Sequence, residues 1–393
     1  MPLNRERAVQ LMQDRGVDAL IASSTENVYY VSDYWSLGKK LGCVVETYVV
    51  LPINNDPAII APMDEADLVI ESGTWIEDLR FYGEPKVDVG EVEEPSEQTA
   101  SLIKIHKETN AETDGASALL KAIEDLGVDK GVIALDTLDL SPEIFEYIKG
   151  KTPGCEIVDG SSLLREIRQV KTQLEVERIL RATEITEKSM EDALEIARSE
   201  ISELDLAGMF TYSVTYDGGE VSQNLIGIGE RSAYPNPVPS IQEAKRRDLL
   251  RLTLGCTWGH YHSNVSRTGV IGRPLAKAQR LWEAIQGAQD SVLDIIEPGV
   301  KLSDLYAAAD KEIAKGEVKM RTPSIGHGLG VECNERPWIK KEAETELLPG
   351  MVINVDIPLL ELGWGGLQLE DTVLVTGDGY ELLTKTDREL YLL

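Results

Sequence analysis

The chain has 393 residues, 42% of them hydrophobic, which is enough to build two cores. Its formal net charge of −29 argues against a protein that binds nucleic-acid phosphates, so no nucleic-acid partner is expected. No apolar run reaches membrane-spanning length, and the charged N-terminal stretch lacks the apolar segment of a signal peptide. These features predict a two-domain cytoplasmic protein with no membrane partner.

The four cysteines are too widely spaced for a disulfide framework or a structural zinc site. They are Cys43, Cys155, Cys256 and Cys333, and we expect reduced, mostly buried thiols. A nucleophilic role stays open only for Cys256 and Cys333, because these two lie within the motifs described below.

Residues 1–160 alternate helical and strand patterns, which predicts an α/β domain with a mixed sheet. Apolar residues at helical spacing predict helices at 5–15, 114–126 and 142–149. Short apolar runs between polar turns predict buried strands at 19–22, 48–52, 58–61 and 132–136. The acidic stretch at 84–96, which contains Pro and Gly, is expected to be an exposed loop.

Residues 161–171 are expected to link this domain to a second one at 172–393. Thr172 followed by Glu175 forms a capping-box pattern at the start of a long amphipathic helix. Further helices are predicted at 275–296 and 302–315, and strands at 249–254, 268–271, 352–357 and 371–375.

Three segments of the second domain combine glycines, strand patterns and chemically reactive side chains. They read RDLLRLTLGCTWGHYHSNVSRTGVIG at 247–272, SIGHGLGVECNERP at 324–337, and GMVINVDIPLL followed by GGLQLEDTVLVT within 350–376. In glycine placement and strand order they resemble the signature regions of the pita-bread hydrolases, which include aminopeptidase P, prolidase and creatinase. The resemblance implies an α/β creatinase-like N-terminal domain, followed by an α+β pita-bread domain with pseudo-twofold symmetry. By analogy it also implies a homodimer that acts on a small-molecule substrate.

The resemblance further implies five metal-ligand positions, which in the family's peptidases carry two Asp, one His and two Glu around two metal ions. Here they read Thr253, Asn264, His327, Asp356 and Glu370. Four carboxylates can neutralise two divalent ions but two cannot, so a dinuclear centre is not expected. The prediction is a site without a metal cofactor. The alternative is one manganese, iron or zinc ion held by Asn264, His327, Asp356 and Glu370.

Creatinase keeps this fold without the ions, and its pattern implies a His as acid and base with Glu residues that bind the substrate. On that precedent His327, Asp356 and Glu370 are predicted to be catalytic, in a hydrolase that cleaves a carbon–nitrogen bond of a small substrate. The pattern departs at Asn236, where the family has a His, and at Ser266, where creatinase has a Glu.

His260 and His262 are departures from the family pattern that could supply a missing acid and base. Two residues apart on a strand, they would point to the same face. They would be catalytic if that face lines the cleft and structural if it is the outer face, and alternation alone does not decide.

Six further residues are candidates for substrate binding: Thr253, Asn264, Asn236, Arg267, Glu335 and Trp35. Arg267 could bind a carboxylate, and Trp35 could stack on a cationic or planar group. The competing interpretations are a structural ion pair for Arg267, a solvated charge for Glu335, and a core or interface position for Trp35.

Two other functions stay open from the sequence. One is a one-metal Xaa-Pro dipeptidase or aminopeptidase-like enzyme or lyase, and the other is a catalytically inactive binding module. Retention of His327, Asp356 and Glu370 together favours an enzyme, whereas loss of both Asp positions favours the binding module.

Overall fold

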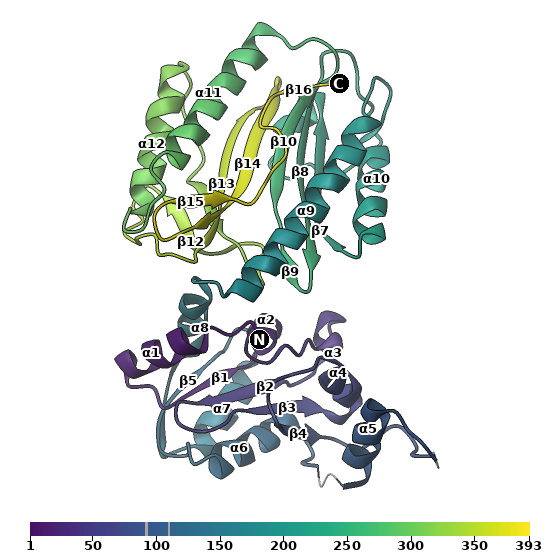
Figure 1. Cartoon of the computed structure of the whole chain (residues 1–393), viewed down its shortest axis with the longest axis vertical. Coiled ribbons are helices and arrows are strands. Elements are labelled where there is room, and N and C mark those ends of the chain that lie inside the picture. Colours follow the sequence, from purple (N-terminus) through teal and green to yellow (C-terminus); the bar gives the residue numbers. More distant parts are fainter. Residues whose placement is uncertain (91–92, 109–110) are drawn as a thin grey trace. The chain divides into compact units, whose positions relative to one another are not determined.

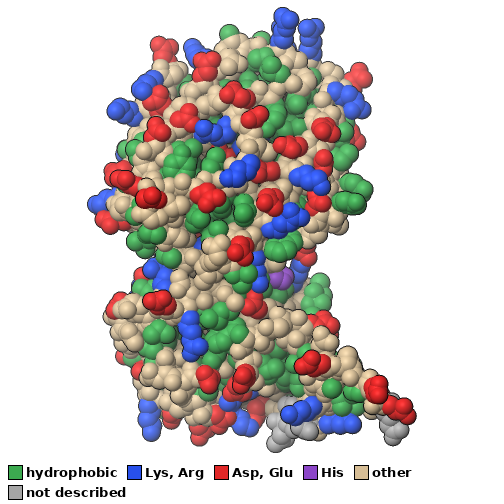
Figure 2. Space-filling model, viewed as in Figure 1, with side chains coloured by type: hydrophobic (Ala, Val, Ile, Leu, Met, Phe, Trp, Pro, Cys, Tyr) green, Lys and Arg blue, Asp and Glu red, His purple; other side chains and the backbone are tan. Residues whose placement is uncertain are grey.

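The computed structural model describes residues 1–90, 93–108 and 111–393. The chain divides into two compact units, Met1–Arg168 and Gln169–Leu393 (Figure 1). Among the described residues, no helix combines the length and the apolar character needed to cross a membrane. Figure 2 shows acidic side chains spread over the face in view and interspersed with basic ones, not gathered in one patch.

The first unit is built on a six-stranded mixed sheet with the order β4-β3-β2-β1-β5-β6. The pairs β1–β2 and β2–β3 are antiparallel, whereas β3–β4, β1–β5 and β5–β6 are parallel. The strands are β1 (Ala19–Ala22), β2 (Tyr48–Pro52), β3 (Ala58–Pro62), β4 (Asp78–Tyr82), β5 (Gly131–Leu135) and β6 (Cys155–Asp159). The mixed sheet predicted for this part of the chain is therefore present.

Apolar clusters lie on both faces of this sheet, and this is why its central strands are apolar throughout. Leu20 and Ile21, neighbours on β1, point to opposite faces and join two separate clusters. The helices are α1 (Arg5–Arg15), α2 (Thr25–Ser32), α3 (Leu37–Lys40), α4 (Ala66–Glu71), α5 (Glu97–Glu108), α6 (Gly115–Asp125), α7 (Pro142–Lys151) and α8 (Gly160–Arg168), with a 3-10 turn η1 (Met63–Glu65). In the stretch expected as an exposed loop, residues 91–92 lie outside the described residues, and most of the rest is exposed.

The stretch expected as a linker, 161–171, is mostly helix. Leu163, Leu164 and Ile167 on α8 are buried in a core of the first unit. Arg168 donates from Nη1 to Oδ1 of Asn27 at 2.7 Å. This correction follows from the apolar face of α8, which completes that core.

The second unit is built on a ten-stranded sheet whose main path is β12-β11-β13-β14-β10-β8-β7, with β9, β15 and β16 pairing to β8, β14 and β10. The strands are β7 (Glu220–Ile228), β8 (Leu249–Trp258), β9 (Tyr261–His262), β10 (Val265–Val270), β11 (Ser324–Gly328), β12 (Glu335–Lys340), β13 (Val352–Glu361), β14 (Gly365–Val375), β15 (Tyr380–Leu382) and β16 (Tyr391–Leu392). The strands expected at 249–254, 268–271, 352–357 and 371–375 correspond to parts of β8, β10, β13 and β14.

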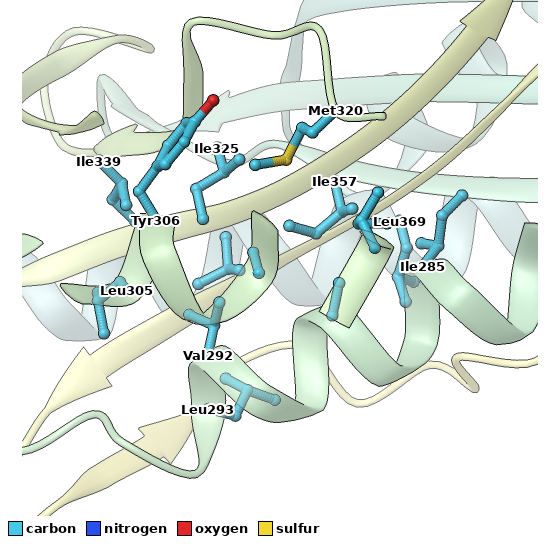
Figure 3. Packing of buried hydrophobic residues seen from close by; sticks show 14 of the residues in the cluster. Ile285, Val292, Leu293, Leu305, Tyr306, Met320, Ile325, Ile339, Ile357 and Leu369 are labelled. Carbon is cyan, nitrogen blue, oxygen red and sulfur yellow. The ribbon is translucent and has the colours of Figure 1, made fainter. Parts of the chain in front are cut away.

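Two pairs of helices cover the two halves of this sheet. The helices are α9 (Gln173–Glu195), α10 (Glu203–Tyr216), α11 (Ala276–Leu293) and α12 (Leu302–Lys315), with a 3-10 turn η2 (Gly229–Ala233). One apolar cluster joins α9 and α10 to β7, β8 and β10, and another joins α11 and α12 to β11–β14. In Figure 3, Ile285 of α11 lies in the same cluster as Ile357 and Leu369 of the sheet. The capping box expected at the start of α9 is present, with Thr172 and Glu175 each bonded to the other's backbone.

Alternation along the strands separates this apolar layer from a polar one. Leu250, Leu252 and Leu254 on β8 join the cluster that includes α9 and α10. Arg251 and Thr253 therefore point to the opposite face of the sheet. That polar face carries the candidate site.

Candidate active site

The register of four neighbouring strands brings predicted site residues into one row. Asp356 on β13 is paired with Glu370 on β14, Glu370 with Ser266 on β10, and Ser266 with Thr253 on β8. Residues directly opposite each other in antiparallel strands have their side chains on the same face. Positions far apart in the sequence thus meet at the middle of the sheet.

Further rows lie on either side, two residues along each strand. On one side Arg251 is paired with Thr268, whose hydroxyl is bonded to the backbone of Gln368. On the other side His327 on β11 is paired with Asn354 on β13. Because side chains alternate along a strand, Arg251, Gln368 and Asn354 share the polar face with the central row.

A cavity of about 250 Å³ lies over these rows. Its lining consists of Gln223, Leu225, Pro235, Asn236, Arg251, Thr253, Asn264, Ser324, Gly326, His327, Asn334, Trp338, Asp356, Gln368 and Glu370. The residues predicted from the sequence that it brings together are Thr253, Asn236, Asn264, His327, Asp356 and Glu370. The volume is below the range usual for drug-sized ligands, which fits a small substrate.

Glu370 is held by neutral donors on both of its oxygens. Its Oε1 accepts from Nδ2 of Asn264 and from Nδ2 of Asn354, both at 2.8 Å. Its Oε2 accepts from Oγ of Ser266, also at 2.8 Å. Since the amide of Asn264 turns its N–H toward Glu370, its Oδ1 points elsewhere, and it has no hydrogen-bond donor within the described part of the chain.

Asp356 is held through an amide relay. Its Oδ1 accepts from Nε2 of Gln368 at 2.8 Å, and Oε1 of Gln368 accepts from Thr253 Oγ1 at 3.1 Å and from Arg251 Nη1. Burial raises the pKa of the Asp356 carboxyl to about 8, and the nearby charge of Glu370 adds to this. Burial also raises the pKa of Glu370, to about 7. The pair therefore retains a proton near neutral pH.

His327 has its tautomer fixed by the backbone. Its Nδ1 lies 2.9 Å from the carbonyl oxygen of Gly328, which can only accept, so Nδ1 carries the proton. Burial lowers the pKa of the imidazole, which favours the neutral ring. Its bare Nε2 lies 3.7 Å from Oε1 of Glu370, and the ring packs against Trp338 at a centroid distance of 5.5 Å. A neutral base therefore faces the carboxyl pair.

Arg251 is a cavity residue that the sequence motifs did not predict. It is 3% exposed and donates from Nε to Ser232 O at 2.7 Å and from Nη2 to Tyr234 O. Burial lowers its pKa to about 10, so it stays charged at neutral pH. A signal was available, because Arg251 interrupts the apolar run LLRLTL at a position that shares a strand face with Thr253.

His260 and His262 do not form the pair expected on one strand face. His260 lies in the turn before β9, with a left-handed backbone at φ 61°. His262 lies on β9, outside the cavity lining, and its backbone N–H donates to Gly330 O at 2.8 Å. Burial lowers the pKa of His262 to about 4, so its ring is neutral. The turn at Gly259 and His260 ends the alternation on which the expectation rested.

Arg267 and Glu335 lie in buried ion pairs away from the cavity lining. Arg267 is fully buried and donates from Nη2 to Oδ1 of Asp371 at 2.7 Å, on the strand face opposite to Ser266. Glu335 accepts from Nζ of Lys171 at 2.6 Å. For Arg267 the structure shows the structural ion pair and not the carboxylate-binding role, because its guanidinium is enclosed by protein acceptors. For Glu335 the interpretation as a solvated charge is wrong, because the side chain is buried in its ion pair with Lys171.

Trp35 belongs to the first unit, where it is half-buried. Its ring packs edge-on against Tyr29, with centroids 5.5 Å apart. Its role in substrate binding stays a prediction.

The cysteines within the motifs have poor nucleophile character. Burial raises the pKa of Cys256, and it raises that of Cys333 to about 12. Neither lines the cavity. Their thiols are protonated at neutral pH, which disfavours thiolate chemistry.

The side chains at the ligand positions do not fit a two-metal centre. Asn264 presents an N–H to Glu370 where a ligand would present an oxygen to a cation. Among the described residues, only Asp356 and Glu370 bring carboxylates to the cavity lining, and Arg251 already places a fixed positive charge there. Two divalent cations in this buried site would therefore lack compensating negative charge.

The polar sheet face has helices on its other side and carries one His and two carboxylates on β11, β13 and β14, which is the arrangement that the resemblance to the pita-bread hydrolases implied. Residues 177–377 match the model of metallopeptidase family M24, and residues 4–170 match that of the creatinase/prolidase N-terminal domain. The chain belongs to family M24 and is a hydrolase of carbon–nitrogen bonds. The expected fold class is thereby confirmed.

The chain is similar to known proteins over nearly its whole length. An Xaa-Pro dipeptidase of Pyrococcus furiosus is 30% identical over 390 residues, which cover 98% of both chains. The crystal structure of a prolidase from Pyrococcus horikoshii superposes with a TM-score of 0.79 at 26% identity, covering 98% of this chain and 99% of that one. An Xaa-Pro dipeptidase structure from Bacillus anthracis, at 22% identity, gives a TM-score of 0.81 and shows the shared fold, covering 99% of both chains.

Proposed function

We propose that this protein hydrolyses a carbon–nitrogen bond of a small substrate with the Asp356–Glu370 pair and His327, without a dinuclear metal centre. The observation that carries the proposal is the bonding of Glu370. Both of its oxygens accept from neutral side chains, Asn264, Asn354 and Ser266. These donors occupy both acceptor directions of Oε1 and one direction of Oε2, which metal ligation would otherwise use.

The proton inventory of the cavity suits general acid–base hydrolysis. The bare Nε2 of His327 can accept a proton from an attacking water, whose oxygen then bonds to the substrate carbon. The proton held by the carboxyl pair can pass to the leaving nitrogen as the carbon–nitrogen bond breaks. The proton gained by His327 returns to the pair at the end of the cycle, so the site is restored.

The acceptors of the cavity define how a substrate nitrogen would be held. Asn264 Oδ1, buried and without a donor in the described residues, can accept an N–H from an amide, amidine or guanidino group. Nε2 of His327, which lies 3.7 Å from Oε1 of Glu370, is a further acceptor on the same wall. The candidate substrates are small amides, amidines and guanidino compounds. Xaa-Pro dipeptides join them because the relatives are named for that activity.

The first experiment measures metal content and turnover together. Tag-free protein, purified without added metal or chelator, is analysed by mass spectrometry and screened against the substrate classes above. We expect substoichiometric metal and turnover that survives a chelator. About one equivalent of manganese, iron or zinc, with activity lost in chelator and restored by that metal, overturns the metal-free mechanism and supports the one-metal alternative.

A matched pair of variants tests the carboxyl pair. Glu370→Gln should abolish turnover, because an amide removes the carboxylate that shares a proton with Asp356, and the remaining group can no longer titrate as part of a pair. Glu361→Gln is the control, since Glu361 lies on the neighbouring strand β13 in an exposed ion pair with Lys277. Full activity in Glu370→Gln would refute the assigned role.

A further inference from the structure

Arg251 is a buried cation whose hydrogen bonds end only on neutral oxygens. Its three acceptors are the backbone carbonyls of Ser232 and Tyr234 and Oε1 of Gln368. Within the described residues it forms no ion pair, whereas another buried arginine of this sheet, Arg267, is paired with Asp371. A guanidinium has more donors than these contacts use.

Burying a charge without a counter-ion is costly, so such a residue needs a reason. Asp356 is the carboxyl group whose charge acts on Arg251, but Gln368 stands between them, accepting from the one and donating to the other. Arg251 lines the cavity. The simplest reason is therefore an anionic group that enters the cavity with the substrate.

The position of Arg251 gives the cavity two different ends. Arg251 is paired with Thr268 on β10, and Asn264, just before β10, lies four residues from Thr268, which is about 13 Å along the strand direction. The cationic guanidinium thus lies at one end of the rows. The acceptors Asn264 Oδ1 and His327 Nε2 lie toward the other.

We propose that Arg251 binds a carboxylate of the substrate, so that the site selects small acids that carry an N–H group at their other end. The proposal rests on the hydrolase function proposed for the same cavity. It narrows the substrate class to amides, amidines or guanidino compounds with a free carboxylate. A fork of guanidinium donors matches a carboxylate and gives orientation as well as affinity. With the acid anchored, the scissile bond is placed over the carboxyl pair.

The test is equilibrium binding, which does not depend on turnover. N-acetylglycine and N-acetylglycinamide, which differ in one charged group, are titrated into the full-length protein by calorimetry. We expect roughly tenfold or greater preference for the carboxylate in the unaltered protein, from a charge-assisted hydrogen bond compared with a neutral one. Equal affinity, or no binding of the carboxylate up to its solubility limit, overturns the proposal.

Two variants locate the preference. Arg251→Gln should bring the ratio of the two affinities close to one, while Arg388→Gln, which removes a charge from a partly exposed pair with Asp290, should leave it unchanged. If Arg251→Gln fails to fold, the preference of the unaltered protein still decides. If the protein prefers the carboxylate but hydrolyses no substrate, the result supports the binding role of Arg251 and contradicts the proposed hydrolase function. If the protein hydrolyses neutral amides and shows no carboxylate preference, the result supports the hydrolase function and contradicts the binding role of Arg251.

Discussion

Replacing Arg267 with methionine should be among the most destabilising single changes in the second unit. Arg267 and Asp371 are fully buried and form an ion pair at 2.7 Å. The same guanidinium also donates to backbone oxygens of Ser266, Glu370 and Asp387. Methionine keeps much of the side-chain volume and removes every donor.

The magnitude follows from what Asp371 would retain. Its Oδ1 would keep one donor, the Thr384 hydroxyl at 2.8 Å, and its Oδ2 has no donor among the described residues. Breaking a buried pair on one side costs about 3–5 kcal/mol, because it leaves an uncompensated charge. For a unit of this size that corresponds to a fall in Tm of about 6–20 °C.

Urea unfolding measures the loss, and a double-mutant cycle identifies its cause. Arg267→Met/Asp371→Asn should recover part of the stability, because it removes the stranded charge as well. Arg181→Met, which breaks an exposed pair with Glu184 on α9, should cost at most about 1 kcal/mol. A loss below about 1 kcal/mol in Arg267→Met, or no recovery in the double variant, would contradict this reasoning.

Three further outcomes are expected. The rate of hydrolysis should follow a bell-shaped pH profile. Protonation of His327 removes the base at low pH, and loss of the carboxyl proton near the Asp356 pKa of about 8 removes the acid at high pH. A rate that still rises well above pH 8 contradicts the assignment. Burial raises the pKa of Glu175 from 4.5 to about 7, so the folded state keeps a proton that the unfolded state releases, and stability should fall as pH rises through this window. In Glu175→Gln the free energy of unfolding, measured by urea titrations at several pH values, should depend less steeply on pH. An unchanged pH dependence would contradict the role given to Glu175. Alanine at Cys256 or Cys333, and iodoacetamide treatment of the unaltered protein, should each leave most of the activity; a loss of roughly tenfold or more would revive a thiol mechanism.

Local rules in the sequence predicted much of the fold. Thr172 and Glu175 indicated the start of α9 because a capping box depends only on residues three apart. The strand predicted at 19–22 has the bounds of β1 because a short apolar run between polar turns has few alternatives. The helical character of 161–168 was missed, since its apolar residues belong to a core that only the assembled unit shows.

The site was predictable where it follows the resemblance and less so elsewhere. His327, Asp356 and Glu370 were found at family positions, and the structure places them together. Arg267 was interpreted as a structural ion pair or as a carboxylate binder, and the structure shows the ion pair. Arg251 was not singled out from the sequence, although it lines the cavity.

Strand alternation and register explain what was missed. Alternation along β10 could have excluded Arg267, because it shares a face with Val265 and not with Ser266. The hydrogen bond from Asn354 to Glu370 needed the register of β13 and β14, which no local pattern supplies.

The amide of Asn264 also has a consequence for how this chain can change over generations. Its N–H is 2.8 Å from Glu370, so an aspartate at 264 would set one carboxylate against another in a buried place. Such a step is penalised unless a cation arrives with it, and the cation in turn needs a second carboxylate near Thr253 and relief from the charge of Arg251. An aspartate at 264 is therefore unfavourable as a single substitution, although it need not be so once the other changes are in place.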